Sequence, residues 1–96
     1  MLDMGFQGKV RPIMIMSRED PNAPRALALF VPLTMETRGG KYEVAMPRVP
    51  WLRLNGYANT QGIGSVGYHE LKDKRGRFDT ATVEKVKDAI RWAFDL

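Results

Sequence analysis

The order of apolar and polar residues divides the chain into several short strands and one helix. Apolar runs at 12–17 (PIMIMS) and 26–34 (ALALFVPLT) predict two buried strands, separated by turn residues at 18–24. Pro32 predicts that the second strand ends or lies at a sheet edge there, because proline has no N–H to donate. Residues 41–46 (KYEVAM) alternate in polarity like a half-buried strand, and the glycine-containing segment 57–71 predicts two more short strands.

Residues 79–94 form the only convincing helical pattern. Val83, Val86, Ile90 and Phe94 recur at spacings of three and four, and Asp79 or Thr80 is suited to cap the first turn. Trp92 lies roughly opposite this apolar stripe, so it is either exposed or packed against a sheet rim or another subunit. Short strands, frequent turns and one terminal helix favour a single, mainly β domain over residues 1–96, built as a small, strongly bent sheet or barrel.

Composition narrows the function classes. The chain has 96 residues with no cysteine and a single histidine, His69, which excludes disulfides, thiolate metal sites and multi-histidine metal sites. We therefore expect no metal and no cofactor, and a reducing cytoplasm as the compartment. No apolar run approaches the roughly 20 residues of a membrane span. The net charge of +4 favours a polyanionic partner, either nucleic acid or an acidic protein, although solubility alone would also explain it.

Two polar residues stand at the ends of the two most apolar strands. Arg11 precedes the first strand and Thr34 ends the second. If these strands are antiparallel neighbours, both residues lie at the same end of the sheet, where a guanidinium and a hydroxyl would together bind phosphate oxygens. The alternatives are structural: Arg11 paired with Glu43 or Asp3, and Thr34 as an ordinary β-forming residue. The basic residues Lys9, Arg38, Lys41 and Arg48 form either a solvated face or a track for RNA.

The order of short motifs along the chain carries more information than any one of them. Gly8-Lys9 and Arg11-Pro12 precede the first apolar strand, and the second ends in Val31-Pro32-x-Thr34. Then come Arg38-Gly39, Glu43-Val44, Gly56 followed five residues later by Gln61, and the terminal helix. From about Leu2 to the C-terminus, this series resembles the MazF/PemK family of toxin–antitoxin toxins.

The resemblance implies a fold and an activity. Members of that family are small SH3-like barrels of the CcdB/MazF type with a C-terminal helix, and they usually form homodimers. They are metal-independent endoribonucleases that cut single-stranded RNA and are silenced by a cognate antitoxin protein. The family's catalytic positions fall on Arg11 and Thr34, and Lys9, Arg38 and Gln61 are the expected RNA contacts. Some members carry an aspartate just before the glutamine; here Asn59 and Thr60 stand there, so the general base stays unassigned.

Two further points stay open at the level of sequence. Residues 2–5 look like only the end of the strand that opens the family fold, so either the start codon is placed late or part of the first strand is missing. Two other functions also fit the fold. One is a non-catalytic, CcdB-like inhibitor of DNA gyrase, and the other is a degenerate member that only binds RNA or an antitoxin.

Overall fold

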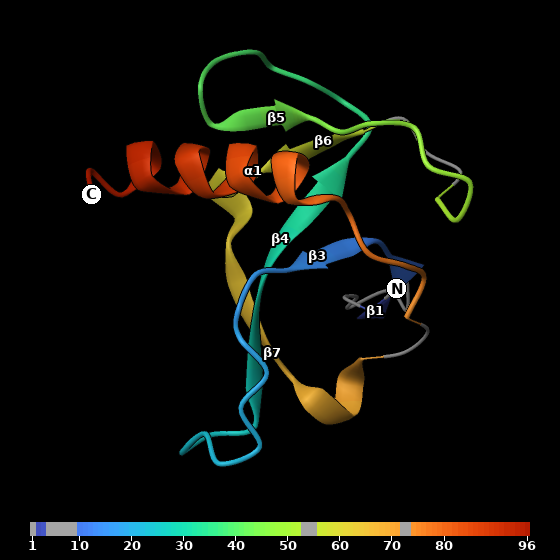
Figure 1. Ribbon diagram of the computed structural model, residues 1–96, viewed down its shortest axis with the longest axis vertical. Coiled ribbons are helices and arrows are strands. Elements are labelled where there is room, and N and C mark those ends of the chain that lie inside the picture. The colour runs from blue at the N-terminus through green and yellow to red at the C-terminus, as the bar shows by residue number, and fades with distance from the viewer. Residues whose placement is uncertain (1, 4–9, 53–55, 72–73) are drawn as a thin grey trace.

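The protein is a bent antiparallel sheet with one helix packed against it (Figure 1). The computed structural model describes residues 2–3, 10–52, 56–71 and 74–96, and the statements below concern these residues. The strands are β1 (Leu2–Asp3), β2 (Val10–Arg11), β3 (Ile13–Ile15), β4 (Leu27–Thr34), β5 (Glu43–Ala45), β6 (Tyr57–Asn59) and β7 (Gly64–Gly67). The helix α1 spans Thr80–Ala93, and short 3₁₀ turns lie at Thr60–Gly62 (η1) and Tyr68–Glu70 (η2). The predicted mainly β class with a C-terminal helix is confirmed.

Strand β4 is the central strand of the sheet because it pairs with three other strands. β3 lies along one side of it, with Ile13 opposite Pro32 and Ile15 opposite Phe30. On the other side, β7 pairs with residues 27–30 and β6 with residues 33–34. β5 extends the sheet beyond β6, and the described strands form a bent, open sheet rather than a closed ring. The short β1 pairs antiparallel with β2.

The second strand does not end at Pro32, but the other predicted alternative holds locally, since Pro32 has no partner strand on one side. The N–H of Leu33 points to β3, since it donates to the Pro12 carbonyl at 3.2 Å. The nitrogen of Pro32 therefore faces the opposite side, in the gap between the segments that pair with β7 and with β6. Gly62 of η1 fills this gap: a Cβ on Gly62 would lie 2.6 Å from the Pro32 ring. The missing N–H falls where no ladder bond is needed.

Two apolar clusters cover the two faces of the sheet. Fully buried Val31 and Val86 lie in the cluster between the sheet and α1, with Met14, Met46 and Ala58. On the other face, Phe30 packs with Ala28 and Val66. The alternating segment 41–46 is confirmed as a half-buried strand, although its ladder is limited to β5.

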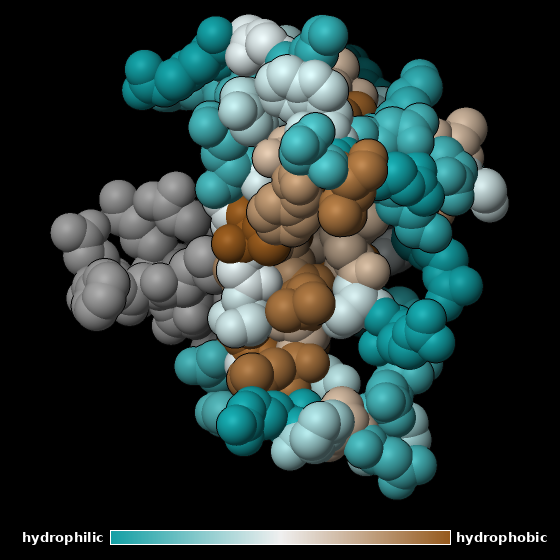
Figure 2. All heavy atoms as spheres, turned by 90° about the vertical axis from the view of Figure 1, so that its left-hand side faces the viewer, coloured by the Kyte–Doolittle hydropathy of each residue, from teal (hydrophilic) through white to brown (hydrophobic). Residues whose placement is uncertain are grey.

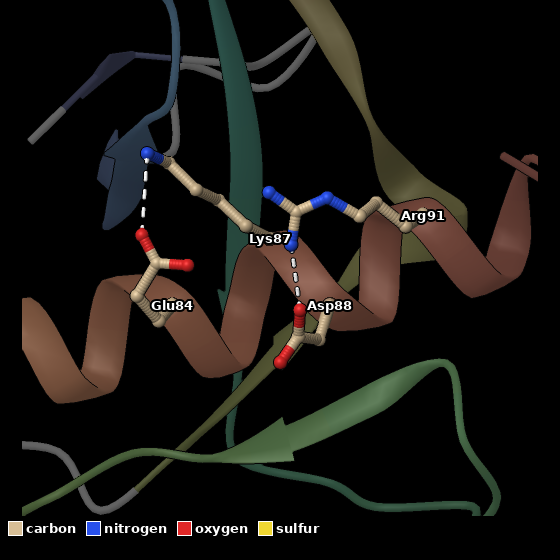
Figure 3. Close-up of polar contacts among 4 residues, drawn as sticks. All are labelled: Glu84, Lys87, Asp88 and Arg91. Atoms are coloured by element: carbon tan, nitrogen blue, oxygen red, sulfur yellow. Dashed lines mark hydrogen bonds and ion pairs between the residues drawn. The ribbon is translucent and has the colours of Figure 1, made fainter.

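The helix begins and faces the core as predicted, but its apolar stripe is shorter. The Asp79 carboxylate caps it by accepting from the Thr82 N–H at 2.8 Å. The stripe ends at Ile90, because the chain turns at Asp95 (φ 58°) and leaves Phe94 58% exposed. Two ion pairs, Glu84–Lys87 and Asp88–Arg91, run along its solvent side at i,i+3 spacing (Figure 3). No described helix combines the length and apolar character that a membrane span requires.

Candidate nucleic-acid interface

A polar pocket of about 340 Å³ lies where β4 ends. Its walls come from the end of β4 and the following loop (Thr34, Glu36, Arg38 and Gly39) and from β5, β6 and η1 (Tyr42, Glu43, Asn59 and Gln61). Three of the residues predicted to act on RNA, Thr34, Arg38 and Gln61, thus share one pocket although they are far apart in sequence. The pairing of β4 with β6 causes this, because it sets Thr34 opposite Tyr57, four residues before Gln61.

The Thr34 hydroxyl is half-buried and fixed by its own loop. It accepts a hydrogen bond from the Glu36 N–H at 3.2 Å, and it also lies 3.4 Å from the Glu36 carbonyl oxygen. The second contact is long for an O–H donor, so a phosphate oxygen would be a better acceptor for this hydroxyl. The hydroxyl is therefore oriented by the backbone while its proton is available to a ligand.

Arg11 belongs to β2, and the structure describes the course of its backbone. The predicted arrangement of the two apolar strands is confirmed, since β3 and β4 are antiparallel neighbours. The Leu33–Pro12 hydrogen bond continues their register beyond β3. That hydrogen bond joins the residue that follows Arg11 to the residue that precedes Thr34. Lys9, the other predicted RNA contact, lies outside the described residues.

Arg38 and Gln61 reach the pocket from two turns of different character. Arg38 is in the exposed loop between β4 and β5, which passes through Gly39 (φ 76°) and Gly40 (φ 92°). This left-handed backbone suits glycine, and explains the Arg-Gly-Gly sequence. Gln61 lies in η1, where its N–H donates to the Asn59 side chain at 3.1 Å. Both residues are exposed, and both line the pocket.

The sequence predicted Glu43 as part of a family motif and as a possible ion-pair partner for Arg11, but its role in the loop was missed. Its carboxylate accepts from the Thr37 hydroxyl and the Arg38 N–H, at 2.5 and 3.0 Å. The Thr37 hydrogen bond, with those of the following amides, lowers the pKa of Glu43. The available signal was an acidic residue that begins a strand three residues after the Gly39-Gly40 turn.

The remaining candidates lie elsewhere. His69 is in η2, beyond β7, and does not line the pocket. Trp51 packs edge-on against Phe78 at 4.8 Å, so it is a packing residue. Trp92 makes a similar contact with Tyr42 at 4.7 Å and is 48% exposed, so it is both packed at the sheet rim and open to solvent. The Ser17 hydroxyl accepts from the Leu29 N–H at 3.0 Å, so Ser17 has a structural role after β3.

A second, wider groove of about 880 Å³ lies outside this pocket. It is lined by apolar side chains such as Ile13, Ile15 and Leu71 and by the basic residues Lys74, Arg75 and Arg77. Thr34, Arg38 and Gln61 do not line it. Within the described ranges, no group of three or more histidine, aspartate or glutamate side chains is arranged to hold a metal ion.

The fold and the pocket define a small, mainly β domain with a site of hydroxyl, amide, guanidinium and carboxylate groups at one strand end. The guanidinium, from Arg38, is the group suited to phosphate. Comparison with known proteins agrees with this class. The family model of PemK-like, MazF-like toxins of type II toxin-antitoxin systems matches residues 4–94. The chain therefore belongs to this family, as its motifs predicted.

Individual relatives support the same assignment. Endoribonuclease MazF1 of Mycobacterium bovis and endoribonuclease MazF4 of Mycobacterium tuberculosis are each 35% identical to the chain over 95 residues, which is 98% of this chain and 86% of each relative. A solved endoribonuclease in complex with its cognate antitoxin, from a mycobacterial species, has a TM-score of 0.84 at 32% identity over 99% of this chain and 88% of that chain. The predicted endoribonuclease toxin is thereby confirmed.

Proposed function

We propose that this toxin cuts single-stranded RNA without a metal ion, by attack of the RNA's own 2′-hydroxyl. The 2′-oxygen forms a bond to the adjacent phosphorus, and the bond from phosphorus to the 5′-oxygen breaks. One proton leaves the 2′-hydroxyl and another is added to the departing 5′-oxygen, so the products end in a 2′,3′-cyclic phosphate and a 5′-hydroxyl. The observation that carries the proposal is the shared pocket of Thr34, Arg38 and Gln61.

Thr34 and Arg11 are the proposed catalytic residues. As charge builds on the phosphoryl oxygens, the Thr34 hydroxyl donates to one of them from an orientation already set by Glu36. Arg11 supplies a permanently charged fork of N–H donors from the neighbouring strand end, because its pKa is too high for it to act as a base. The register of β3 with β4 supports this pairing of roles.

Arg38, Gln61 and Lys9 are the proposed RNA contacts. The guanidinium of Arg38 is suited to a phosphate on either side of the scissile bond. The Gln61 amide both donates and accepts, so it is suited to a base edge exposed by single-stranded RNA. Lys9 would add charge along the RNA backbone.

The proposed protein partners are a cognate antitoxin and a second copy of the chain, in the cytoplasm. One solved relative is an endoribonuclease bound to its antitoxin, and an acidic antitoxin segment would compete with RNA for the pocket of this basic chain. Figure 2 shows apolar side chains gathered on one face of the molecule. In the view they extend from the level of α1 down to the level of β4 and β7. Leu29 of β4 is 52% exposed, and Phe94 beyond α1 is also exposed. A homodimer would bury such surface.

One experiment separates this function from its alternatives. The purified protein is incubated with a long single-stranded RNA in EDTA, and the new ends are mapped. Discrete cuts that leave cyclic phosphates are expected. Intact RNA together with inhibited DNA gyrase would favour the CcdB-like alternative. A folded protein with neither activity would favour a degenerate member that only binds.

A further inference from the structure

The loop that carries Arg38 is tied to one carboxylate. The Thr37 hydroxyl donates to Glu43 Oε1 at 2.5 Å, and the Arg38 N–H donates to Oε1 and Oε2 at 3.0 and 3.4 Å. The Gly39 N–H in turn donates to Thr37 Oγ1 at 3.0 Å. Three consecutive residues of an exposed loop are therefore attached, directly or through one hydroxyl, to Glu43.

Glu43 is itself held by the sheet. It is the first residue of β5 and pairs with Asn59 of β6. Asn59 caps η1 by accepting from the Gln61 N–H. The carboxylate thus connects the Arg38 loop to the strand pair that leads into Gln61, across the pocket that Thr34 also lines.

A carboxylate in a pocket for phosphate needs a physical reason, since it repels an anionic substrate. Proton transfer is a poor reason. A general base works best with a pKa near the operating pH, whereas the hydrogen bond from Thr37, followed by those of the loop amides, lowers the pKa of Glu43. Both oxygens also already accept hydrogen bonds from the loop.

The loop, in contrast, needs an anchor. It turns through Gly39 and Gly40 at positive φ, and neither glycine has any atom within 4 Å of where a Cβ would lie. Glycine loses more conformational freedom on ordering than other residues. Without the bonds to Glu43, little packing would hold this turn in one shape.

We propose that Glu43 is a positioning residue for RNA cleavage, which holds the 37–39 turn so that Arg38 reaches an RNA phosphate next to the one that the Thr34 hydroxyl contacts. The proposal rests on the proposed ribonuclease function. It assigns to Glu43 a role through Arg38 and not a proton transfer.

The test uses conservative and non-conservative pairs of variants at both ends of the main hydrogen bond. Cleavage of a single-site RNA is measured under kcat/KM conditions across pH. Glu43→Ala should lower kcat/KM by about 10²-fold, as expected when a substrate-orienting group is misplaced. Glu43→Gln keeps a carbonyl oxygen that accepts from the loop, and should keep most of the activity with an unchanged pH profile. Thr37→Val should lower kcat/KM, and Thr37→Ser should restore it toward the wild-type value.

Coupling and controls complete the test. Combining Thr37→Val with Glu43→Ala should be no worse than Glu43→Ala alone, since both remove the same anchor. Glu84→Ala, which removes the same charge from an exposed site on α1, should cleave like wild type. Far-UV circular dichroism confirms folding, and if Glu43→Ala does not fold, Glu43→Gln and the Thr37 pair decide.

Three results would overturn the role. If Glu43→Gln were as impaired as Glu43→Ala, and its residual activity no longer fell at acidic pH, Glu43 would be a general base and not a positioning residue. Glu43→Ala or Thr37→Val as active as wild type would show that the anchor is unimportant. A wild-type protein that cuts no RNA would reject the proposed function itself, and this is established before any variant is measured.

Discussion

Gly56 lies directly against Thr34: a Cβ on Gly56 would come within 2.9 Å of the Thr34 carbonyl oxygen. That contact is between β4 and the residue just before β6, and the Gly56 carbonyl also accepts from the Met46 N–H at 2.9 Å. Only glycine lets the three segments approach this closely beside the proposed catalytic threonine.

Substituting Gly56 should therefore impair cleavage through Thr34. In Gly56→Ala the added methyl has to push β6 away from Thr34, which tilts the hydroxyl and lowers kcat/KM by about tenfold or more. Cleavage kinetics measure this, and Gly64→Ala is the matched control, since its methyl would meet the Phe30 ring, on the other face of the sheet, instead of Thr34. Equal activity of Gly56→Ala and wild type would show that this contact does not set the catalytic geometry.

Removing Arg38 should weaken RNA binding and should make that binding less dependent on salt concentration. Arg38→Ala is expected to raise KM. It should also reduce the slope of log affinity against log salt concentration by about one, because one fewer counterion is released on binding. Arg25→Ala is the control, because Arg25 is exposed just before β4, at the end of the strand away from Thr34. A salt slope that is the same for both variants would contradict the role of Arg38.

Arg11 is expected to act through its charge and its shape. Arg11→Ala should lower kcat by orders of magnitude while the circular dichroism spectrum is retained, because the arginine stabilises the transition state and not the core. Arg11→Lys should recover only part of the rate, since an ammonium lacks the planar fork. A folded Arg11→Ala protein with undiminished cleavage would remove Arg11 from the active centre.

The helix cap predicts a pH dependence of stability. The hydrogen bonds from Thr82 lower the pKa of Asp79 in the folded state. A lowered pKa means that the stabilisation is present above the ordinary pKa of the carboxyl and is lost as pH falls through the folded value. In Asp79→Asn this part of the acid-induced fall in Tm should disappear, while the cap itself is kept. Thermal melts between neutral and acidic pH would show it, and parallel curves for both proteins would contradict it.

Periodicity and motif order predicted most of the fold and three residues of the pocket. The spacing of Val83, Val86 and Ile90 located the helix because burial of one helical face leaves a strong pattern. Thr34, Arg38 and Gln61 followed from their matches to family motifs. The course of β4 through Pro32 could not be predicted, because it depends on which partner strand lies beside each N–H, and that is a tertiary property.

The role of Glu43 could not be predicted from the sequence, for a related reason. A glutamate next to a Gly-Gly turn is compatible with a solvated strand end, an ion pair or a loop anchor, and the three differ only in where Thr37 and Arg38 place their donors. The contact of Trp92 with Tyr42 is similar. Both depend on how the chain returns to the sheet after a turn of variable shape.

The central claim is that the Thr34 hydroxyl donates to the reacting phosphate, and its most direct test is single-turnover cleavage by Thr34→Val and Thr34→Ser in EDTA. Valine keeps the shape of the side chain and removes the donor, so the rate should fall by about 10²-fold or more, with the fold unchanged. Serine restores the hydroxyl and should recover most of the rate, with the same cyclic-phosphate ends. Cleavage by Thr34→Val at the wild-type rate would contradict the account.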